Sequence, residues 1–327
     1  MTTSSIGTNS RNYSTIALWW AACPANLVTA TQTWEGECYN DSEFALTTTL
    51  TLSGVTTSDT YYPELRCAAG HSFVDNANKL TNALRYNQAN GVAIKQSVNW
   101  QPAMTLNNSY LRLTGLQIFI NGNYTQYINL FAPTMILRNC IFQKRTNTYE
   151  IVNNTGATLI NCVLMTAGNG PAVLAYNSAS KLYNCTLISL GSSSLGINKV
   201  YGGADSSIVK NCAIFGFSTA MDPGSWGAGT DYNASDDDTL PAGTHNLTSL
   251  TFANQFQNVA GASTLDLRTK TGNSLVAGTR DQTNTNDLDI VGQARSTTTP
   301  TIGAWEYVVG FSFLPILQRK TNTLLRR

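Results

Sequence analysis

A short pattern of hydrophobic and polar positions recurs four times in the middle of the chain. It reads LRNCIF at residues 137 to 142 and returns as LINCVL, LYNCTL and VKNCAI, which places the asparagine at positions 139, 161, 184 and 211. The spacings are therefore 22, 23 and 27 residues. A period of about 20 to 30 residues is typical of stacked repeats, in which each unit covers the hydrophobic face of its neighbour.

The asparagine column predicts a sharp corner in each repeat. Two earlier segments, LTGLQI and ANGVAI, place Gly115 and Gly91 at the same phase, with 24 residues between successive positions. Glycine and asparagine both tolerate the left-handed backbone conformation, which costs other L-residues about 1 to 2 kcal/mol. Asparagine adds an amide, and identical amides stacked one rung apart can hydrogen-bond along the axis. We therefore expect a structural ladder of Asn139, Asn161, Asn184 and Asn211.

Hydrophobic and polar positions alternate on both sides of this corner, which predicts two short strands with one inward and one outward face. The inward positions are Leu113, Leu137, Leu159, Leu182 and Val209 before the corner, then Leu116, Cys140, Cys162, Cys185 and Cys212, then Ile118, Phe142, Leu164, Leu187 and Ile214. The outward positions are Thr114, Arg138, Ile160, Tyr183 and Lys210 before the corner and Gln117, Ile141, Val163, Thr186 and Ala213 after it. Short strands at this period predict an all-β chain that winds as a right-handed parallel β-helix with three strands per coil.

The first coil of such a stack exposes a sheet edge that needs a cover. The segment NYSTIALWWAACPANL offers one, because Ser14 or Thr15 can cap a short helix that Pro24 ends. The side chains expected to face the first coil are Ile16, Trp19, Trp20 and Cys23, and a strand is expected at 33 to 39. The predicted organisation is one domain with an N-terminal cap in 1–30, the β-helix and its closing segment in 31–306, and a C-terminal arm in 307–327.

Composition agrees with an all-β protein and excludes several classes of partner. Charged residues make up 12% of the chain and the formal net charge is +1, so no strong field directs it to nucleic acid or to an anionic membrane. The most apolar run, at 307 to 317, is too short to span a bilayer and contains a proline. The opening residues lack a cationic region followed by an apolar core, so we expect no secretory signal.

Four of the seven cysteines belong to the repeat. Cys140, Cys162, Cys185 and Cys212 do not have the paired spacing of a zinc site. Stacked one rung apart they would lie roughly 4.8 Å from one another, which is inside the range that disulfides allow. Disulfides therefore stay open as an alternative, and we favour small buried apolar side chains.

One acidic stretch, TDYNASDDDT at 230 to 239, is the best local candidate for an ion or glycan site. Its carboxylates are Asp231, Asp236, Asp237 and Asp238. They could hold a calcium ion or supply an acid and a base to a glycosidic bond. The alternative, which we favour, is a solvated turn whose side chains cap their own backbone. His71 and His245 lie in separate loops, and we expect neither to have a partner that suggests a triad or a metal site.

Both ends of the chain resemble a known class of proteins. The opening GTNSRNYSTIALWWAACPANLVTA with WEGECYNDSEF is similar to the N-terminal cap and first coil of right-handed β-helix proteins of tailed bacteriophages and prophages. LDLRTKTGNSLVAGTRD, DLDIVGQAR and PTIGAWEY are similar to the closing segment of many β-helix repeat proteins. The resemblance implies a virion protein. We expect it to be non-enzymatic, because the Asp-His and Arg patterns that mark the pectin-degrading β-helix enzymes are not found in the sequence. The resemblance also implies salt-bridge and turn roles for Asp266, Arg268, Asp287, Asp289, Arg295 and Glu306.

The C-terminal arm predicts how such a protein docks. VVGFSFLPILQRKTNTLLRR joins an apolar segment to four cations with no acid. An apolar run outside a closed fold must be buried, either as a last strand on its own helix or against a neighbouring subunit or another virion component. The expected docking residues are Phe311, Phe313, Leu314, Ile316, Leu317, Arg319, Lys320, Arg326 and Arg327.

These observations favour a capsid decoration or head-spike protein. The alternative is a tail spike, or a β-helix protein that degrades or binds polysaccharide. The expected partners are capsid or tail subunits, further copies of the chain in a homo-oligomer such as a trimer, and a host glycan that an outward side chain such as Tyr183 would touch. We expect no nucleic acid, cofactor, metal or catalytic residue. The expected location is the virion, after synthesis in the bacterial host cytoplasm.

Overall fold

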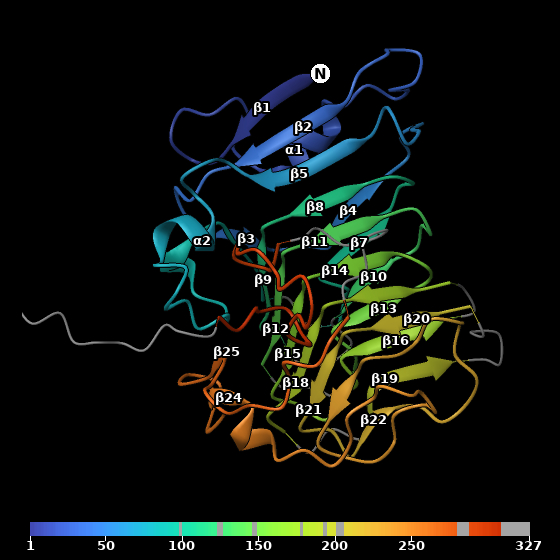
Figure 1. Cartoon of the computed structure of the whole chain (residues 1–327). Helices are drawn as coiled ribbons and strands as arrows, with labels where there is room; N and C mark the ends of the chain where they lie inside the picture. Colours follow the sequence, from blue (N-terminus) through green and yellow to red (C-terminus); the bar gives the residue numbers. More distant parts are fainter. Residues whose placement is uncertain are drawn as a thin grey trace, which may run out of the picture.

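Parallel strands wind into a right-handed β-helix, as the repeat predicted (Figure 1). The structure is a computed structural model and describes residues 1–97, 100–122, 127–145, 149–176, 179–191, 195–200, 206–279 and 288–308. Each regular coil runs from a first sheet through a tight corner into a second sheet, and then through a longer loop into a third. No helix among the described residues is long and apolar enough to cross a membrane.

The three sheets are parallel throughout, and strands one coil apart are hydrogen-bonded neighbours. The first sheet contains β1 (Thr2–Ile6), β2 (Trp34–Cys38), β5 (Pro63–Cys67), β8 (Arg112–Thr114), β11 (Ile136–Arg138), β14 (Thr158–Ile160), β17 (Lys181–Tyr183) and β20 (Ile208–Lys210). The second contains β3 (Phe44–Leu46), β6 (Ala93–Gln96), β9 (Gln117–Ile120), β12 (Ile141–Lys144), β15 (Val163–Thr166), β18 (Thr186–Ser189), β21 (Ala213–Phe215) and β23 (Ala234–Ser235). The third contains β4 (Leu50–Ser53), β7 (Met104–Asn107), β10 (Ile128–Leu130), β13 (Val152–Asn154), β16 (Val173–Tyr176), β19 (Leu195–Val200) and β22 (Thr219–Met221).

The strand register stacks like residues on like residues. Leu137 pairs with Leu113 on one side and with Leu159 on the other, and Phe142 pairs in the same way between Ile118 and Leu164. All six side chains are buried in one continuous core inside the coils. The predicted inward columns are therefore confirmed. Full burial of each such side chain contributes about 1.5 to 3 kcal/mol.

The corner residues have the conformation that their types permit. Asn139, Asn161, Asn184 and Asn211 have φ values of 52°, 52°, 51° and 55°, and Gly115 has a φ of 76°. Gly91 is different, and the prediction that it forms a corner between two strands is wrong. In this coil the corner is replaced by an insertion at residues 68–90, which contains α2 (Phe73–Asn76) and η1 (Gln88–Asn90). The insertion separates β5 from Gly91, so Gly91 does not join two strands directly.

The N-terminal cap has the predicted helix, α1 (Ile16–Ala21). The side-chain oxygen of Thr15 accepts a hydrogen bond of 3.1 Å from the backbone N–H of Leu18, which satisfies one free donor at the start of the helix. Ile16 and Trp19 are buried against the first coil. The sequence did not predict β1, which pairs with β2 and extends the first sheet beyond the cap helix.

After β23 the chain leaves the helix and runs along the outer face of the second sheet. This closing segment, residues 236–279 and 288–308, contains η2 (Phe252–Asn254) and an antiparallel pair, β24 (Phe256–Asn258) and β25 (Asp266–Thr269). Figure 1 shows it in orange and red beside the strands of the second sheet. Its apolar side chains form a second core with outward residues of that sheet, which are Ile141, Val163, Met165, Ile188, Ala213 and Phe215.

The second core corrects one part of the outward prediction. Ile141, Val163 and Ala213 point away from the first core, but each is 0% exposed because the closing segment covers it. Tyr183, expected on the surface as a glycan contact, is only 2% exposed. An outward-facing side chain of a coil is therefore buried wherever another segment of the chain packs on it.

The closing segment also reaches the insertion that interrupts an early coil. Arg268 donates to the backbone oxygen of Leu80 at 2.7 Å, and Arg85 donates to that of Leu265 at 2.8 Å. A backbone hydrogen bond of 3.1 Å from Leu267 to Ala83 lies between them. The middle of the closing segment, at residues 265–268, is thus fastened to the insertion at residues 68–90.

Candidate functional site

Two of the corner asparagines, Asn161 and Asn211, hold the closing segment, and Asn161 is also bonded to Asn139 of the predicted ladder. Asn161 donates to the side-chain oxygen of Asn139 at 3.2 Å and to the backbone oxygen of Leu288 at 2.9 Å. Asn211 accepts a hydrogen bond of 2.9 Å from the backbone N–H of Thr279, and its amide donates to the backbone oxygen of the same residue. The sequence pointed to a ladder along the axis but gave no sign of these sideways contacts, which join residues far apart in the chain.

The repeat cysteines serve packing. Cys140, Cys162, Cys185 and Cys212 are 0% exposed, and all seven cysteines of the chain are free thiols. The sulfur of Cys162 lies 3.4 Å from the backbone oxygen of Ile160 and 3.6 Å from that of Leu137 in the coil before. Burial raises the pKa values of Cys140, Cys162 and Cys185 well above the ordinary value of a thiol. A neutral, buried thiol is a poor nucleophile and a poor metal ligand.

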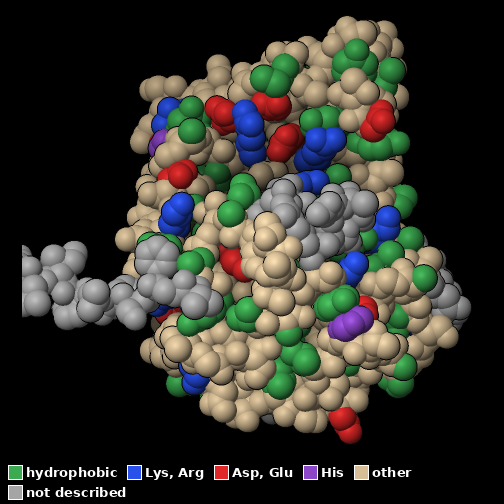
Figure 2. All heavy atoms as spheres, viewed as in Figure 1, with side chains coloured by type: hydrophobic (Ala, Val, Ile, Leu, Met, Phe, Trp, Pro, Cys, Tyr) green, Lys and Arg blue, Asp and Glu red, His purple; other side chains and the backbone are tan. Residues whose placement is uncertain are grey.

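The first sheet carries interleaved charges on its outer face. Figure 2 shows acidic and basic side chains beside one another over the upper strands of this sheet. Arg66 lies 3.0 Å from Glu35 and 3.0 Å from Glu37, and the guanidinium of Arg112 lies over the ring of Tyr62 at 3.4 Å. These charges compensate one another locally, so the face lacks the single-sign field that attracts a polyanion.

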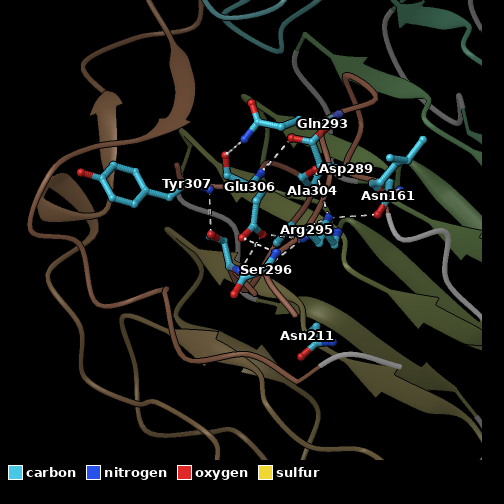
Figure 3. A network of polar contacts seen from close by, with 12 residues as sticks. Asn161, Asn211, Asp289, Gln293, Arg295, Ser296, Ala304, Glu306 and Tyr307 are labelled. Atoms are coloured by element: carbon cyan, nitrogen blue, oxygen red, sulfur yellow. Dashed lines mark hydrogen bonds and ion pairs between the residues drawn. The ribbon is translucent and has the colours of Figure 1, made fainter. Parts of the chain in front are cut away.

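A buried ionic network lies inside the closing segment (Figure 3). Asp289, Arg295 and Glu306 are 0%, 6% and 2% exposed, and Arg295 lies 3.5 Å from Glu306. One oxygen of Asp289 accepts from the backbone N–H groups of Val291 and Gln293, and the other accepts from that of Glu306 at 2.9 Å. Burial raises the pKa of Asp289 and lowers that of Arg295.

This network supports the salt-bridge and turn roles that the family resemblance implied. Asp266 and Arg268 likewise form an ion pair at 2.6 Å. Asp287 lies outside the described residues. Because every member of the network is hydrogen-bonded to backbone, its function is to hold the loops of the closing segment in one arrangement.

A cavity of about 290 Å³ lies on the outside of this network. Trp305 and Tyr307, which stand on either side of buried Glu306, line it together with Gln293. The amide of Gln293 donates to the backbone oxygen of Glu306 at 3.2 Å, so the network fixes that wall directly. β24 and β25 supply the opposite wall through Gln257, Arg268 and Thr269. No sequence pattern pointed to this cavity, because its walls come from segments that are separate in the chain.

The acidic stretch is divided by the fold. Asp236 accepts hydrogen bonds of 3.1 and 3.0 Å from the backbone N–H of Gly216, and Asp237 accepts one of 2.6 Å from that of Ala220. Burial raises the pKa of Asp236. Asp238 is exposed. Two of the four carboxylates therefore hold the turn between β21 and β22, and the described residues contain no cluster of three or more His, Cys, Asp or Glu suited to a metal ion.

Asp231 instead pairs with His245, which the sequence analysis expected to have no such partner. The imidazole Nδ1 lies 2.8 Å from a carboxylate oxygen of Asp231, and the ring stacks on Tyr232 with centroids 4.2 Å apart. Burial acts to raise the pKa of Asp231, but the hydrogen bonds from His245 and Tyr232 outweigh it and leave the pKa lowered. The separation of 14 residues follows no standard motif, so the sequence gave no signal for the pair.

The predicted docking arm, residues 307–327, is described only at residues 307 and 308. All of its expected anchors, from Phe311 to Arg327, lie outside the described residues. The described chain ends with Tyr307, whose backbone N–H donates to Thr301 at 2.8 Å, and with exposed Val308.

Comparisons with known proteins do not place the chain in a family. No protein-family profile matches it, and no curated protein sequence does. Among solved structures it is similar to pectate lyase Pel9A, with 11% identity over 94% of this chain and 98% of that chain and a TM-score of 0.41. It is also similar to the pectin methylesterase from Aspergillus niger, with 10% identity over 80% of this chain and 92% of that chain and a TM-score of 0.40. These values carry no argument about activity.

Proposed function

We propose that the protein is a non-enzymatic structural component of a tailed-phage particle, a capsid decoration or head-spike protein that docks through its C-terminal arm. The resemblance of both chain ends to phage β-helix proteins supports the phage origin. The structural role is supported by one observation: charged side chains of the closing segment and the acidic stretch bind the protein's own backbone and its corner residues. Asp236, Asp237 and Asp289 accept hydrogen bonds from backbone N–H groups, and Arg295 joins the closing segment to the helix.

The position on the particle is tested by electron microscopy of purified particles labelled with antibodies against this protein. We expect label at regular positions on the head. Label confined to the tail would replace this proposal with the tail-spike alternative. Particles that carry no label and lack the protein by mass spectrometry would contradict any virion role.

The docking role of the arm is tested by binding full-length protein to particles stripped of it. We expect deletion of residues 309–327 to abolish binding while the circular dichroism spectrum and thermal transition stay unchanged. A variant that replaces only the cations Arg319, Lys320, Arg326 and Arg327 by Gln separates charge from apolar anchoring. Undiminished binding by the deletion variant would show that the arm does not dock the protein.

A polysaccharide-degrading function is the second candidate, and the pair of Asp231 and His245 is the observation that favours it. The side chain of His245 is 51% exposed, and Asp231 fixes its tautomer as it would for a general base. If the protein cleaves a host polysaccharide, His245→Gln should abolish cleavage and Asp238→Asn should not. Absence of cleavage with every surface polysaccharide of the host would remove this candidate.

A further inference from the structure

We propose that the cavity between β24–β25 and residues 305–307, called here the closing pocket, binds a neutral sugar unit of a surface glycan. This inference rests on the proposed function only for the source of the glycan. The closing pocket is defined by Gln257, Arg268, Thr269, Gln293, Trp305 and Tyr307.

Its shape and size suit a single sugar unit. The volume of about 290 Å³ lies just below the range for sites of drug-sized molecules, which begins at about 300 Å³. Trp305 and Tyr307 contribute aromatic surface, on which the C–H face of a pyranose ring packs. An aromatic wall beside a few oriented polar groups is the usual composition of a specific ligand site.

An unpaired hydroxyl group points to a polar ligand. The side-chain oxygen of Thr269 has no hydrogen-bond partner among the described residues, although Thr269 is only 4% exposed. Leaving such a buried group unpaired costs about 1 to 3 kcal/mol, and a ligand hydroxyl would remove that cost. The neighbouring amide of Gln257 donates to the backbone oxygen of Thr269 at 3.2 Å, which fixes the position of its own oxygen at the pocket wall.

The charges around the pocket are already compensated, which favours a neutral ligand. Arg268 pairs with Asp266 at 2.6 Å and donates to the backbone of Leu80. The carboxylate of Glu306 accepts from the backbone N–H groups of Ser296 and Thr301 at 3.0 and 2.8 Å and faces Arg295. Among the described residues that line the pocket, a uronate or phosphate would therefore find no free cation, whereas a sugar hydroxyl needs only the donors and acceptors that Thr269 and the two glutamines supply.

The walls are held in place before any ligand arrives. The backbone N–H of Glu306 donates to Asp289, and that of Tyr307 donates to Thr301, so the segment with both aromatic rings is fixed at two successive residues. The hydroxyl of Tyr307 lies 3.3 Å from that of Thr271. A preorganised site loses little conformational entropy on binding, which compensates for the small contact area of one sugar.

The test uses full-length protein and five probes, the methyl glycosides of glucose, galactose and mannose, free N-acetylglucosamine, and methyl glucuronide. Saturation-transfer NMR and tryptophan fluorescence should show saturable binding of at least one neutral probe, and weaker binding of the glucuronide. Thr269→Val, which keeps the shape and removes the hydroxyl, should weaken binding about tenfold. Gln257→Leu, at an exposed position, should weaken it without affecting folding. Thr29→Val, at an exposed position in the N-terminal cap, is the matched control and should bind unchanged.

The inference is overturned if no neutral probe binds, if the glucuronide binds more tightly than every neutral probe, or if Thr269→Val and Gln257→Leu bind as tightly as the control. These results are independent of the particle experiment. Sugar binding by a protein that is absent from particles would contradict the virion role alone. Particle labelling without sugar binding would contradict the closing pocket alone.

Discussion

The guanidinium of Arg295 donates a hydrogen bond of 3.0 Å to the side-chain oxygen of Asn161, a residue 134 positions earlier in the chain. Both side chains are buried, and the contact joins the closing segment to the corner of a central coil. Asn161 thus has three roles. Its backbone adopts the left-handed conformation of the corner, and its amide bonds both to Asn139 in the coil before and to Leu288 in the closing segment.

Replacing Asn161 by Gly separates the role of the backbone at the corner from the role of the amide. Glycine keeps the left-handed corner, so the change removes only the amide and leaves the buried charge of Arg295 with one partner fewer. We expect the free energy of unfolding in urea to fall by about 2 to 3 kcal/mol. Asn139→Gly, which removes a single neutral hydrogen bond, should cost about 1 kcal/mol. Equal losses for the two variants would contradict the anchoring role.

Truncating Phe215 should release the closing segment. Its ring stacks on Phe252 with centroids 5.5 Å apart and meets Phe256 edge-on at 5.6 Å. We expect Phe215→Ala to cost about 3 to 5 kcal/mol and to expose residues 236–308 to limited proteolysis before the coils. Phe119→Ala, on the same sheet but only half-buried against Tyr86, is the control. If proteolysis cuts both variants at the same sites and rates, the second core does not hold the closing segment.

Lys144 predicts that stability rises with pH above neutrality. Its side chain is buried, its ammonium donates to the backbone oxygens of Tyr149 and Glu150 at 2.8 Å each, and burial lowers its pKa to about 7 from 10.5. Between these two values the unfolded state binds more protons than the folded state, so the free energy of unfolding increases with pH. Below about pH 7 both states hold the proton, and this residue adds no further pH dependence.

The difference between wild type and Lys144→Met isolates that contribution. We expect it to change by at most about 1.4 kcal/mol per pH unit inside the window and to be flat below it. Lys79→Met, at an exposed position, should show no such slope. A wild-type stability that falls relative to Lys144→Met as the pH rises would contradict the lowered pKa.

The repeat thiols should resist alkylation in the folded protein. Cys140, Cys162, Cys185 and Cys212 are 0% exposed, and burial raises the pKa of partly buried Cys23 to about 12. We expect iodoacetamide at neutral pH to leave the four unlabelled by peptide mass spectrometry and to label all of them in denaturant. Disulfide-linked peptides from neighbouring coils would overturn the free-thiol assignment.

The sequence predicted the interior of the coils well because the information there is local. A corner between Leu137 and Cys140 is specified by residue types within one turn, and its repetition specifies the stack. The packing of the closing segment on the second sheet was less predictable. The residues near Ile141 and Val163 in the sequence do not indicate which segment, 100 or more residues away, covers them. Apolar residues in the outward column were the available signal that something covers it. The pair of Asp231 and His245 and the closing pocket left no comparable signal, because each forms only when separate loops are folded.

A linear stack of coils normally contacts only its neighbours, so its ends can fray independently. Here Arg268 and Leu80 meet across 188 residues and Arg85 and Leu265 across 180. Early coils can form as they leave the ribosome, but the insertion between them gains its outer contacts only after the residues near 268 have been synthesised. Through these contacts the closing segment makes distant coils unfold together. A force applied at the C-terminus would have to detach the closing segment from the second sheet and from the insertion before it could unwind the first coil.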